Sequence, residues 1–474
     1  MPQPSDTPAQ VRRHHSLSSA QFASLARGGG GQDAIGQLVA GQQSKHLILL
    51  GRVAELARRG DHPDDALGVA GYQLLARVQR EDPEAAAEVI GYPSVGAWAL
   101  HVVRSSQART ESVPTDTASA SNAALPGVRP SGLANIAASA AIRAGLDAEI
   151  EVPVLGTGVL LPSLGTAEAV GRTAIVAAKE AEVRSGDLRV RARSGEPGWR
   201  ELRQVMAGPL SVLIDDLDPF RMPTPDGGPT GRLTPTQVTG FRDTLRAAWP
   251  VLSAARAAEI AAIVRVIVPY RPPVSGNFHI SVSSPQVFGT VAMSWQPGKY
   301  TCAETLVHET QHLKLCALLD LVALTRPDDG QVYYAPWRPD PRPISGLLQG
   351  AYAFLGVSGF WREQRQSAPD PGLRQRAYAE FARWRDGTAT AAATLLRSGQ
   401  LTSAGETFVE TMAEVLDEWR REPVPADALA VARRESEQHL ARWQANNGQA
   451  DTAGDLAGGI RSRADRNRGR VGYR

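Results

Sequence analysis

Apolar residues recur at helical spacing through most of the chain, and a central stretch shows strand-type patterns instead. Helical spacing runs from about residue 18 to 103, returns at 235–264, and continues after 344 with turns near 367–371, 399–403 and 423–425. Alternating or short apolar runs lie at 150–154, 159–162, 188–193, 210–214, 266–269, 278–282 and 288–293. The pattern predicts an α+β fold that is predominantly helical.

The same pattern suggests a division of the chain into five parts. We expect an N-terminal helical region over 1–104, a linker or long loop over 105–132, and a mixed α+β region over 133–285. A helical domain over 286–446 and a basic tail over 447–474 complete the chain. The tail is either a disordered, solvated segment or a docking segment for an acidic partner.

Composition narrows the functional class only slightly. The 474 residues carry a net charge of +2 and 21% charged residues, so nothing indicates a nucleic-acid or membrane-surface partner. The N-terminus has no apolar core of a signal peptide, no segment is apolar enough to span a bilayer, and only two cysteines, Cys302 and Cys316, are present. We therefore expect a cytoplasmic protein without a disulfide framework.

The strongest chemical motif is H-E-x-x-H at 308–312. On a helix, His308 and His312 lie about 40° apart around the axis and one turn apart along it, so both imidazoles can reach one divalent metal. Glu309 lies beside them, as a candidate catalytic residue on a metal-bound water or as a partner that orients a ligand. Thr301 and Glu304 form a potential capping box, which predicts a buried, zincin-like helix from about 302 to 323. The alternative is an accidental pair of surface histidines.

Two histidines do not complete a metal site, and two candidates exist for a third protein ligand. Gln349 lies on the next predicted helix, where many H-E-x-x-H peptidases supply a glutamate. Glu410, with Glu406 and Glu414 on nearby turns, is the other candidate, although these three fit a solvated helix face equally well. Asp320 is too far along the predicted helix, at about 18 Å from His308.

A stiff loop rich in proline and aromatic residues precedes Gln349 and carries Arg338 and Arg342. Guanidinium groups grip carboxylates through two parallel hydrogen bonds. The loop is therefore either a carboxylate anchor for a cosubstrate beside the metal or a structural loop with ordinary salt bridges.

Several segments together resemble one bacterial family. The chain is similar to it in TLVHETQHLKLCALLDLV at 305–322, APWRPDPRP at 335–343, GLLQGAYAFLGV at 346–357 and SSPQVFGTVAMS at 283–294, with weaker similarity before residue 270. The family comprises H-E-x-x-H peptide-modification proteins encoded beside ribosomally made precursor peptides, understood as Fe(II)- and 2-oxoglutarate-dependent peptide β-hydroxylases.

The resemblance implies a function and a site. His308 and His312 would bind iron, Gln349 falls in the family's LLQG pattern as the favoured third ligand, and Arg338 or Arg342 would hold 2-oxoglutarate. The partner would be a precursor peptide hydroxylated at a side-chain β-carbon. A zinc metallopeptidase with Glu309 as general base stays the main alternative, followed by a non-catalytic, metal-stabilised binding protein of a peptide-maturation cluster.

Overall fold

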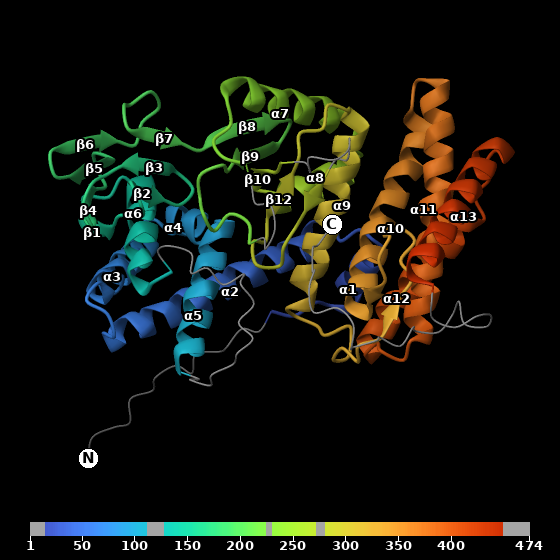
Figure 1. The fold of residues 1–474 in the computed structure, drawn as a ribbon, viewed down its shortest axis with the longest axis horizontal. Coiled ribbons are helices and arrows are strands. Elements are labelled where there is room, and N and C mark those ends of the chain that lie inside the picture. The colour runs from blue at the N-terminus through green and yellow to red at the C-terminus, as the bar shows by residue number, and fades with distance from the viewer. Residues whose placement is uncertain (1–14, 111–127, 224–229, 272–279, 449–474) are drawn as a thin grey trace, which may run out of the picture.

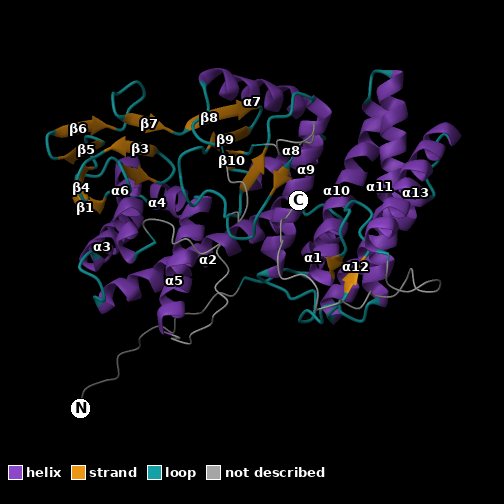
Figure 2. Cartoon of the chain, in the orientation of Figure 1, coloured by secondary structure: helices purple, strands orange, loops and turns teal. Residues whose placement is uncertain are grey.

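The computed structural model describes residues 15–110, 128–223, 230–271 and 280–448. These residues form 13 α-helices and several sheets, so a predominantly helical α+β fold is confirmed (Figures 1 and 2). The first helices are α1 (Ser19–Ala26), α2 (Gly31–Arg59), α3 (Asp65–Glu81), α4 (Pro83–Ile90), α5 (Pro93–Thr110) and α6 (Leu133–Arg143). The later ones are α7 (Pro235–Ala248), α8 (Ala254–Ile263), α9 (Lys299–Leu319), α10 (Ile344–Ser367), α11 (Pro371–Arg397), α12 (Ser403–Arg420) and α13 (Ala426–Asn447).

A five-stranded sheet lies in the middle of the molecule, with the strand order β11-β12-β10-β9-β8. Its members are β8 (Arg203–Ala207), β9 (Leu210–Ile214), β10 (Val266–Pro269), β11 (Ser281–Val282) and β12 (Thr290–Met293). β9, β10 and β12 are parallel, and the two edge strands run antiparallel to their neighbours. The chain boundary expected after residue 285 falls inside this sheet, because β10 and β12 pair directly.

Two smaller antiparallel sheets occupy the left of Figure 1. One has the order β1-β4-β5-β6 and contains β1 (Glu149–Pro153), β4 (Thr173–Ala177), β5 (Glu182–Ser185) and β6 (Leu188–Arg191). The other contains β2 (Gly158–Leu161), β3 (Gly165–Glu168) and β7 (Trp199–Glu201). The strands expected at 150–154, 159–162, 188–193 and 210–214 are all present, within one or two residues.

Two buried cores flank the five-stranded sheet. Along β10, Ile267 faces the core that contains α9 to α12, here called the α9 core, while Val266 and Val268 face the core that contains α3 to α6, the α6 core. Both faces of β10 are therefore buried, as its unbroken apolar run requires. α2 contributes to both cores, through Leu38 to the first and Val53 to the second.

The helix starts follow local sequence in several places. Thr234 caps α7 by accepting a hydrogen bond from the backbone of Gln237, whose side chain bonds back, and Pro235 occupies the first turn. The predicted helix over 235–264 divides into α7 and α8 around a short 3₁₀ turn at Trp249–Val251. The last four helices match the predicted spans and turns.

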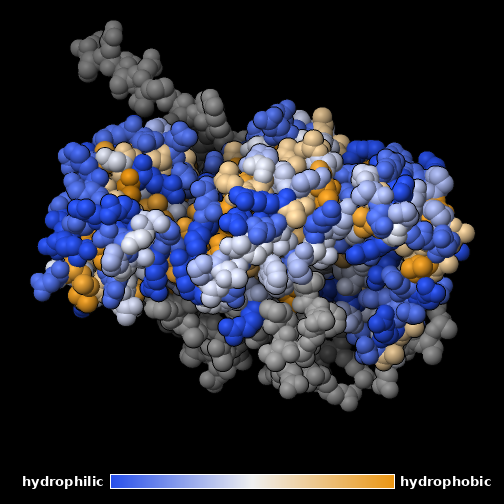
Figure 3. All heavy atoms as spheres, turned by 90° about the horizontal axis from the view of Figure 1, so that it is seen from above, coloured by the Kyte–Doolittle hydropathy of each residue, from blue (hydrophilic) through white to orange (hydrophobic). Residues whose placement is uncertain are grey.

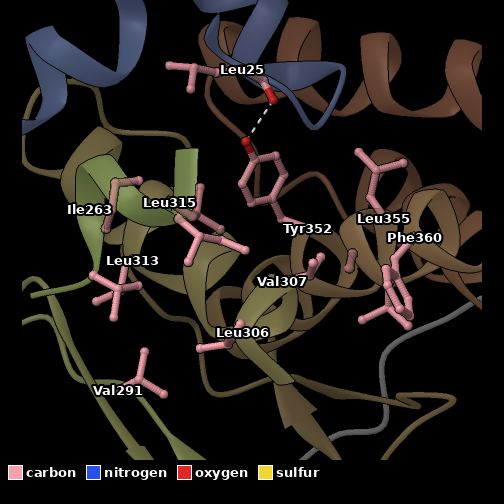
Figure 4. Packing of buried hydrophobic residues seen from close by; sticks show 14 of the residues in the cluster. Leu25, Ile263, Val291, Leu306, Val307, Leu313, Leu315, Tyr352, Leu355 and Phe360 are labelled. Carbon is pink, nitrogen blue, oxygen red and sulfur yellow. Dashed lines mark hydrogen bonds between the residues drawn. The ribbon is translucent and has the colours of Figure 1, made fainter. Parts of the chain in front are cut away.

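The expected start of the metal-motif helix is wrong. α9 begins at Lys299, Gly298 is its N-cap, and no side chain makes a capping hydrogen bond there. Thr301 and Glu304 lie inside the first turns and cannot form a capping box. The helix ends at Leu319, with Asp320 as its C-cap, four residues before the predicted end. It is buried as expected, and Leu306, Leu313 and other α9 residues pack into the α9 core (Figure 4).

Some expectations fall on residues that the structure does not describe. The expected linker overlaps the end of α5, which continues to Thr110, and 111–127 lie outside the described residues. So do residues 278–279 of the strand expected at 278–282, and the tail from 449 onward.

The described helices give no membrane span: none combines the length and apolarity that crossing a bilayer requires. The face in Figure 3 is mainly hydrophilic, with scattered hydrophobic areas. The large hydrophobic side chains that are exposed, including Ile48, Val170 and Trp295, come from separate segments of the chain.

Candidate metal centre

The two motif histidines face one another on α9. The Nε2 atoms of His308 and His312 lie 3.1 Å apart, and the ring centroids are 4.7 Å apart with the planes at 75°. One helical turn separates the residues, so both side chains leave the same face of the helix. The convergence of two imidazole nitrogens is confirmed, and these nitrogens are the donor atoms that a divalent metal binds in proteins.

Gln349 of α10 reaches the far side of the His312 ring. Its Oε1 atom lies 3.0 Å from Nδ1 of His312, and its amide nitrogen donates to Sγ of Cys316 at 3.5 Å. Because a carbonyl oxygen can only accept, Nδ1 carries the proton, and Nε2 keeps its lone pair. The ring is thus held in the tautomer that binds a metal through Nε2. Gln349 lies where it orients a metal-binding imidazole, and the expectation that its own oxygen binds the metal stays a prediction.

His308 is held in its neutral form. Burial, and to a smaller extent the neighbouring His312, lower the pKa of His308 to about 4. Phe354 packs edge-on against the ring, with centroids 5.1 Å apart. At neutral pH the imidazole is uncharged and available as a ligand, so the donor set fits a borderline metal ion such as iron or zinc.

Glu309 is almost fully buried, at 2% exposure. Its Oε1 atom accepts a hydrogen bond of 2.6 Å from the hydroxyl of Ser281 on β11, and its Oε2 atom has no partner among the described residues. The edge strand of the sheet therefore holds the carboxylate in place. A buried oxygen without a partner is costly, and such atoms often serve a ligand or substrate.

A short hairpin carries the two predicted anchor arginines. β13 (Val332–Tyr333) pairs with β14 (Arg342–Pro343), and α10 begins directly afterwards. Arg338 and Arg342 both bind the carboxylate of Asp340, at 3.0 and 3.2 Å. All three side chains are partly exposed, so a soluble anion can approach the guanidinium groups.

The hairpin is joined to the histidine pair by aromatic side chains. Trp337 stacks on Phe354 with centroids 4.8 Å apart and planes at 16°, and Phe354 also contacts Trp384 of α11. Gly350 makes this packing possible, because a Cβ atom there would lie 2.4 Å from the indole nitrogen of Trp337. Phe354 thereby links the arginine hairpin to His308.

The attachment of α9 to the α1–α2 turn could not be expected from the sequence pattern. The backbone carbonyl of Gly28 accepts hydrogen bonds from Gln311 at 2.9 Å and from Lys314 at 3.0 Å. Lys314 is fully buried and also binds Glu259 of α8 at 2.9 Å. Tyr352 of α10 adds a hydrogen bond of 2.7 Å to the carbonyl of Leu25 (Figure 4). These contacts attach α9 to the α1–α2 turn and to α8, and α10 to the end of α1.

The other candidate ligands are exposed to solvent or have partners other than the histidines. Glu406, Glu410 and Glu414 are exposed on α12, as a solvated helix face predicts. Asp320 accepts from Lys45 and Gln42 of α2 instead. In the described part of the chain, no group of three or more His, Cys, Asp and Glu side chains is arranged to hold a metal ion. The cysteines are both free, since they lie at separate turns of α9.

Comparison with family models and with curated proteins gives no match to this chain.

Proposed function

We propose that the chain is an Fe(II)- and 2-oxoglutarate-dependent dioxygenase that hydroxylates a side-chain β-carbon of a ribosomally synthesised precursor peptide. The observation that carries the proposal is the pair of facing Nε2 atoms on His308 and His312, one ring being fixed by Gln349. An arginine-bearing hairpin that ends only a few residues before Gln349 adds the second part of such a site.

His308 and His312 would hold the iron, and Gln349 is the favoured third ligand or ligand-orienting group. Bound iron, with 2-oxoglutarate and O₂, supplies the oxidising power needed to hydroxylate an unactivated carbon. The protein's part is to keep both rings neutral and fixed. Burial around His308 and the amide of Gln349 perform these tasks. α9 to α13 would then form the metal-binding domain.

Arg338 and Arg342 are the candidate anchors for 2-oxoglutarate. Each guanidinium can bind a carboxylate through two hydrogen bonds, and Asp340 already holds the pair in a common orientation. The cosubstrate carboxylate would join or replace Asp340 at one of them. Trp337 and Phe354 would separate this polar region from His308.

Glu309 would position the peptide. Its unpartnered Oε2 atom can accept a backbone N–H, while Ser281 keeps the carboxylate from turning away. A negative, buried acceptor of this kind fixes the position of a substrate amide next to the metal. The precursor peptide would be made in the cytoplasm, where we expect the enzyme to act.

The test is anaerobic reconstitution of the protein with Fe(II), followed by addition of O₂, 2-oxoglutarate and the precursor peptide encoded beside the gene. We expect a product heavier by one oxygen atom, with one succinate formed for each hydroxylation. Two peptide fragments formed with zinc and without 2-oxoglutarate would overturn the proposal. His308→Ala serves as the control that loses activity in either case.

A zinc metallopeptidase is the second candidate, because Glu309 is a buried carboxylate next to both histidines. In that reaction Glu309 would remove a proton from a metal-bound water. Glu309→Gln separates the two candidates, since it would abolish hydrolysis but would only weaken peptide positioning in a hydroxylase. A purely structural metal predicts no turnover with either metal.

A further inference from the structure

A cavity of about 310 Å³ lies beside the α6 core, between α5, α6 and the loop that connects β1 to β2. In Figure 1 these elements lie on the left, whereas α9 and α10, which carry the histidines and Gln349, lie to the right. The walls are largely apolar and include Trp98, Ile136, Leu160 and Phe220. The cavity is therefore separate from the candidate metal centre and has room for a ligand side chain.

A buried carboxylate lines this cavity. Asp218 is 2% exposed, and its two oxygens accept hydrogen bonds from the hydroxyl of Ser94 at 2.5 Å and from the backbone N–H of Phe220 at 2.7 Å. Both donors are neutral. The carboxyl group of Asp218 thus accepts hydrogen bonds from two donors, and neither donor carries a positive charge.

A second buried carboxylate lies behind the first. Asp215 accepts from the hydroxyl of Tyr92 at 2.7 Å and from the backbone N–H of Asp218 at 2.9 Å. Within the described ranges, neither Asp215 nor Asp218 forms a direct salt bridge, whereas Asp216 between them binds two arginines. The guanidinium of Arg221 donates to backbone carbonyls instead. Burial raises the pKa of Asp215, and burial together with the neighbouring Asp215 raises that of Asp218 to about 7, although the charge of Arg221 lowers both.

Asn135 provides an independent sign that the cavity is a ligand site. This cavity residue is 4% exposed, and its amide nitrogen donates to the backbone carbonyl of Leu160 at 2.9 Å. Its Oδ1 atom has no partner among the described residues. Buried amide oxygens are rarely left unpaired, so the wall of the cavity offers an acceptor that awaits a donor.

We propose that this cavity binds an ammonium group on an aliphatic stem, as in the side chain of a lysine in a bound peptide. The stem would pack against Trp98 and Ile136, and the ammonium would meet Asp218 and the Oδ1 atom of Asn135. An aromatic wall favours a cation as well.

The mouth of the cavity suits a peptide rather than a free amine. Arg129, Arg172 and Asp64 line it, and Arg129 and Arg172 are exposed to solvent. Charges of both signs can bind the carbonyl and amide groups that flank a lysine in a peptide chain. The inference does not depend on the reaction at the histidines.

The experiment measures binding to the full-length, metal-free protein by titration calorimetry and saturation-transfer NMR. The probes are Nα-acetyl-lysine N-methylamide and Nα-acetyl-norleucine N-methylamide, which share the stem and differ in the ammonium group. We expect the lysine probe to bind about fivefold more tightly or better, with its ε-methylene protons closest to the protein. Equal binding of both probes, or binding of neither, would overturn the proposal.

Two variants locate the site. Asp218→Asn keeps the shape and removes the charge, and should weaken binding of the lysine probe about tenfold while leaving the norleucine probe unchanged. Val154→Trp, at a partly exposed wall position, should fill the cavity and exclude both probes. Asp187→Asn, at an exposed turn outside the cavity lining, is the matched control. Retained lysine binding in Val154→Trp would contradict the assignment even if Asp218→Asn failed to fold. Oxygenase assays need none of these probes, so failure here is distinct from failure of the proposed function.

Discussion

Gln349 contacts the side of the His312 ring that is opposite to His308. Its Oε1 atom lies 3.0 Å from Nδ1, the ring nitrogen that does not face His308. The contact joins α10 to α9 and fixes both the ring orientation and the position of the imidazole proton. Groups in this position usually change metal affinity by one to two orders of magnitude when removed.

Gln349→Ala should therefore lower the affinity for Fe(II) by about 10- to 100-fold while leaving the fold intact. Gln349→Glu keeps an acceptor at the same distance and should retain most of the affinity. Anaerobic metal titration followed by competition with a chelator measures both. If Gln349→Ala binds iron as tightly as the unmodified protein, the amide has no role in the metal site.

Ser281→Ala separates metal binding from substrate positioning. Loss of the hydroxyl leaves both Glu309 oxygens without a partner among the described residues, so the carboxylate can turn within its pocket. We expect unchanged iron content and a fall of about tenfold in peptide hydroxylation. Metal analysis and product mass spectrometry are the measurements, with Ser281→Thr as the variant that keeps the hydroxyl. A parallel loss of iron would show that Ser281 supports the metal instead.

Lys314→Met should destabilise the protein strongly. The substitution leaves Glu259 without its cation and the Gly28 carbonyl with one donor fewer, and breaking a buried ion pair on one side costs about 3–5 kcal/mol. The double variant Lys314→Met with Glu259→Gln should recover most of this loss. Urea denaturation of the unmodified protein, the single variants Lys314→Met and Glu259→Gln, and the double variant gives the four free energies of unfolding. Additive effects of the two substitutions would contradict a coupled pair.

The stability of the protein should depend on Glu304 in neutral solution. Burial raises the pKa of Glu304 to about 7, and the carboxylate of Glu380 adds to the shift. The folded state therefore holds a proton that the unfolded chain releases near pH 4.5, so this contribution to stability is present at low pH and is lost as the pH rises through 7. Glu304→Gln cannot ionise.

Relative to the unmodified protein, Glu304→Gln should gain stability between pH 5.5 and 8.5, by about 2 kcal/mol at most. Denaturation curves at the two pH values measure the change. Glu180→Gln, at an exposed turn, is the control and should show no such trend. A constant difference across this range would show that Glu304 is not protonated in the folded protein.

Gly350→Ala tests the aromatic link between the hairpin and His308. The new Cβ atom would lie 2.4 Å from Nε1 of Trp337, so the indole must move off Phe354, at a cost of about 1–3 kcal/mol. Gly36→Ala in α2 meets no neighbour and should stabilise the protein by up to about 1 kcal/mol. Thermal unfolding compares the two, and near-ultraviolet circular dichroism reports on the tryptophan. Equal stabilisation by both alanines would contradict the packing described.

Much of the fold follows from patterns that are local in the sequence. Most helices, half of the described strands and the convergence of His308 and His312 depend on periodicity and on a spacing of four residues, so they could be predicted. The start of α9 could not be predicted, because Thr301 and Glu304 match the sequence pattern of a capping box although the helix begins at Lys299. Tertiary packing decides where the helix begins. Glu304 lies instead among charged side chains of α11.

Contacts between distant parts of the chain left no local pattern. The bond from Lys314 to Gly28 joins residues 286 positions apart, and the bond from Ser281 to Glu309 joins an edge strand to a helix. The sequence singled out Gln349, but only the structure shows which nitrogen of His312 it meets. The division of the chain was expected from composition, which carries no information on how β10 and β12 pair.

The position of α2 affects how the protein unfolds and whether it can be divided. At 29 residues it is about 43 Å long, and its N-terminal half lies in the interior that surrounds α9, its C-terminal half in the interior that surrounds α6. A single helix thus contributes side chains to both hydrophobic cores. Neither half of the molecule can be excised with its own hydrophobic interior complete.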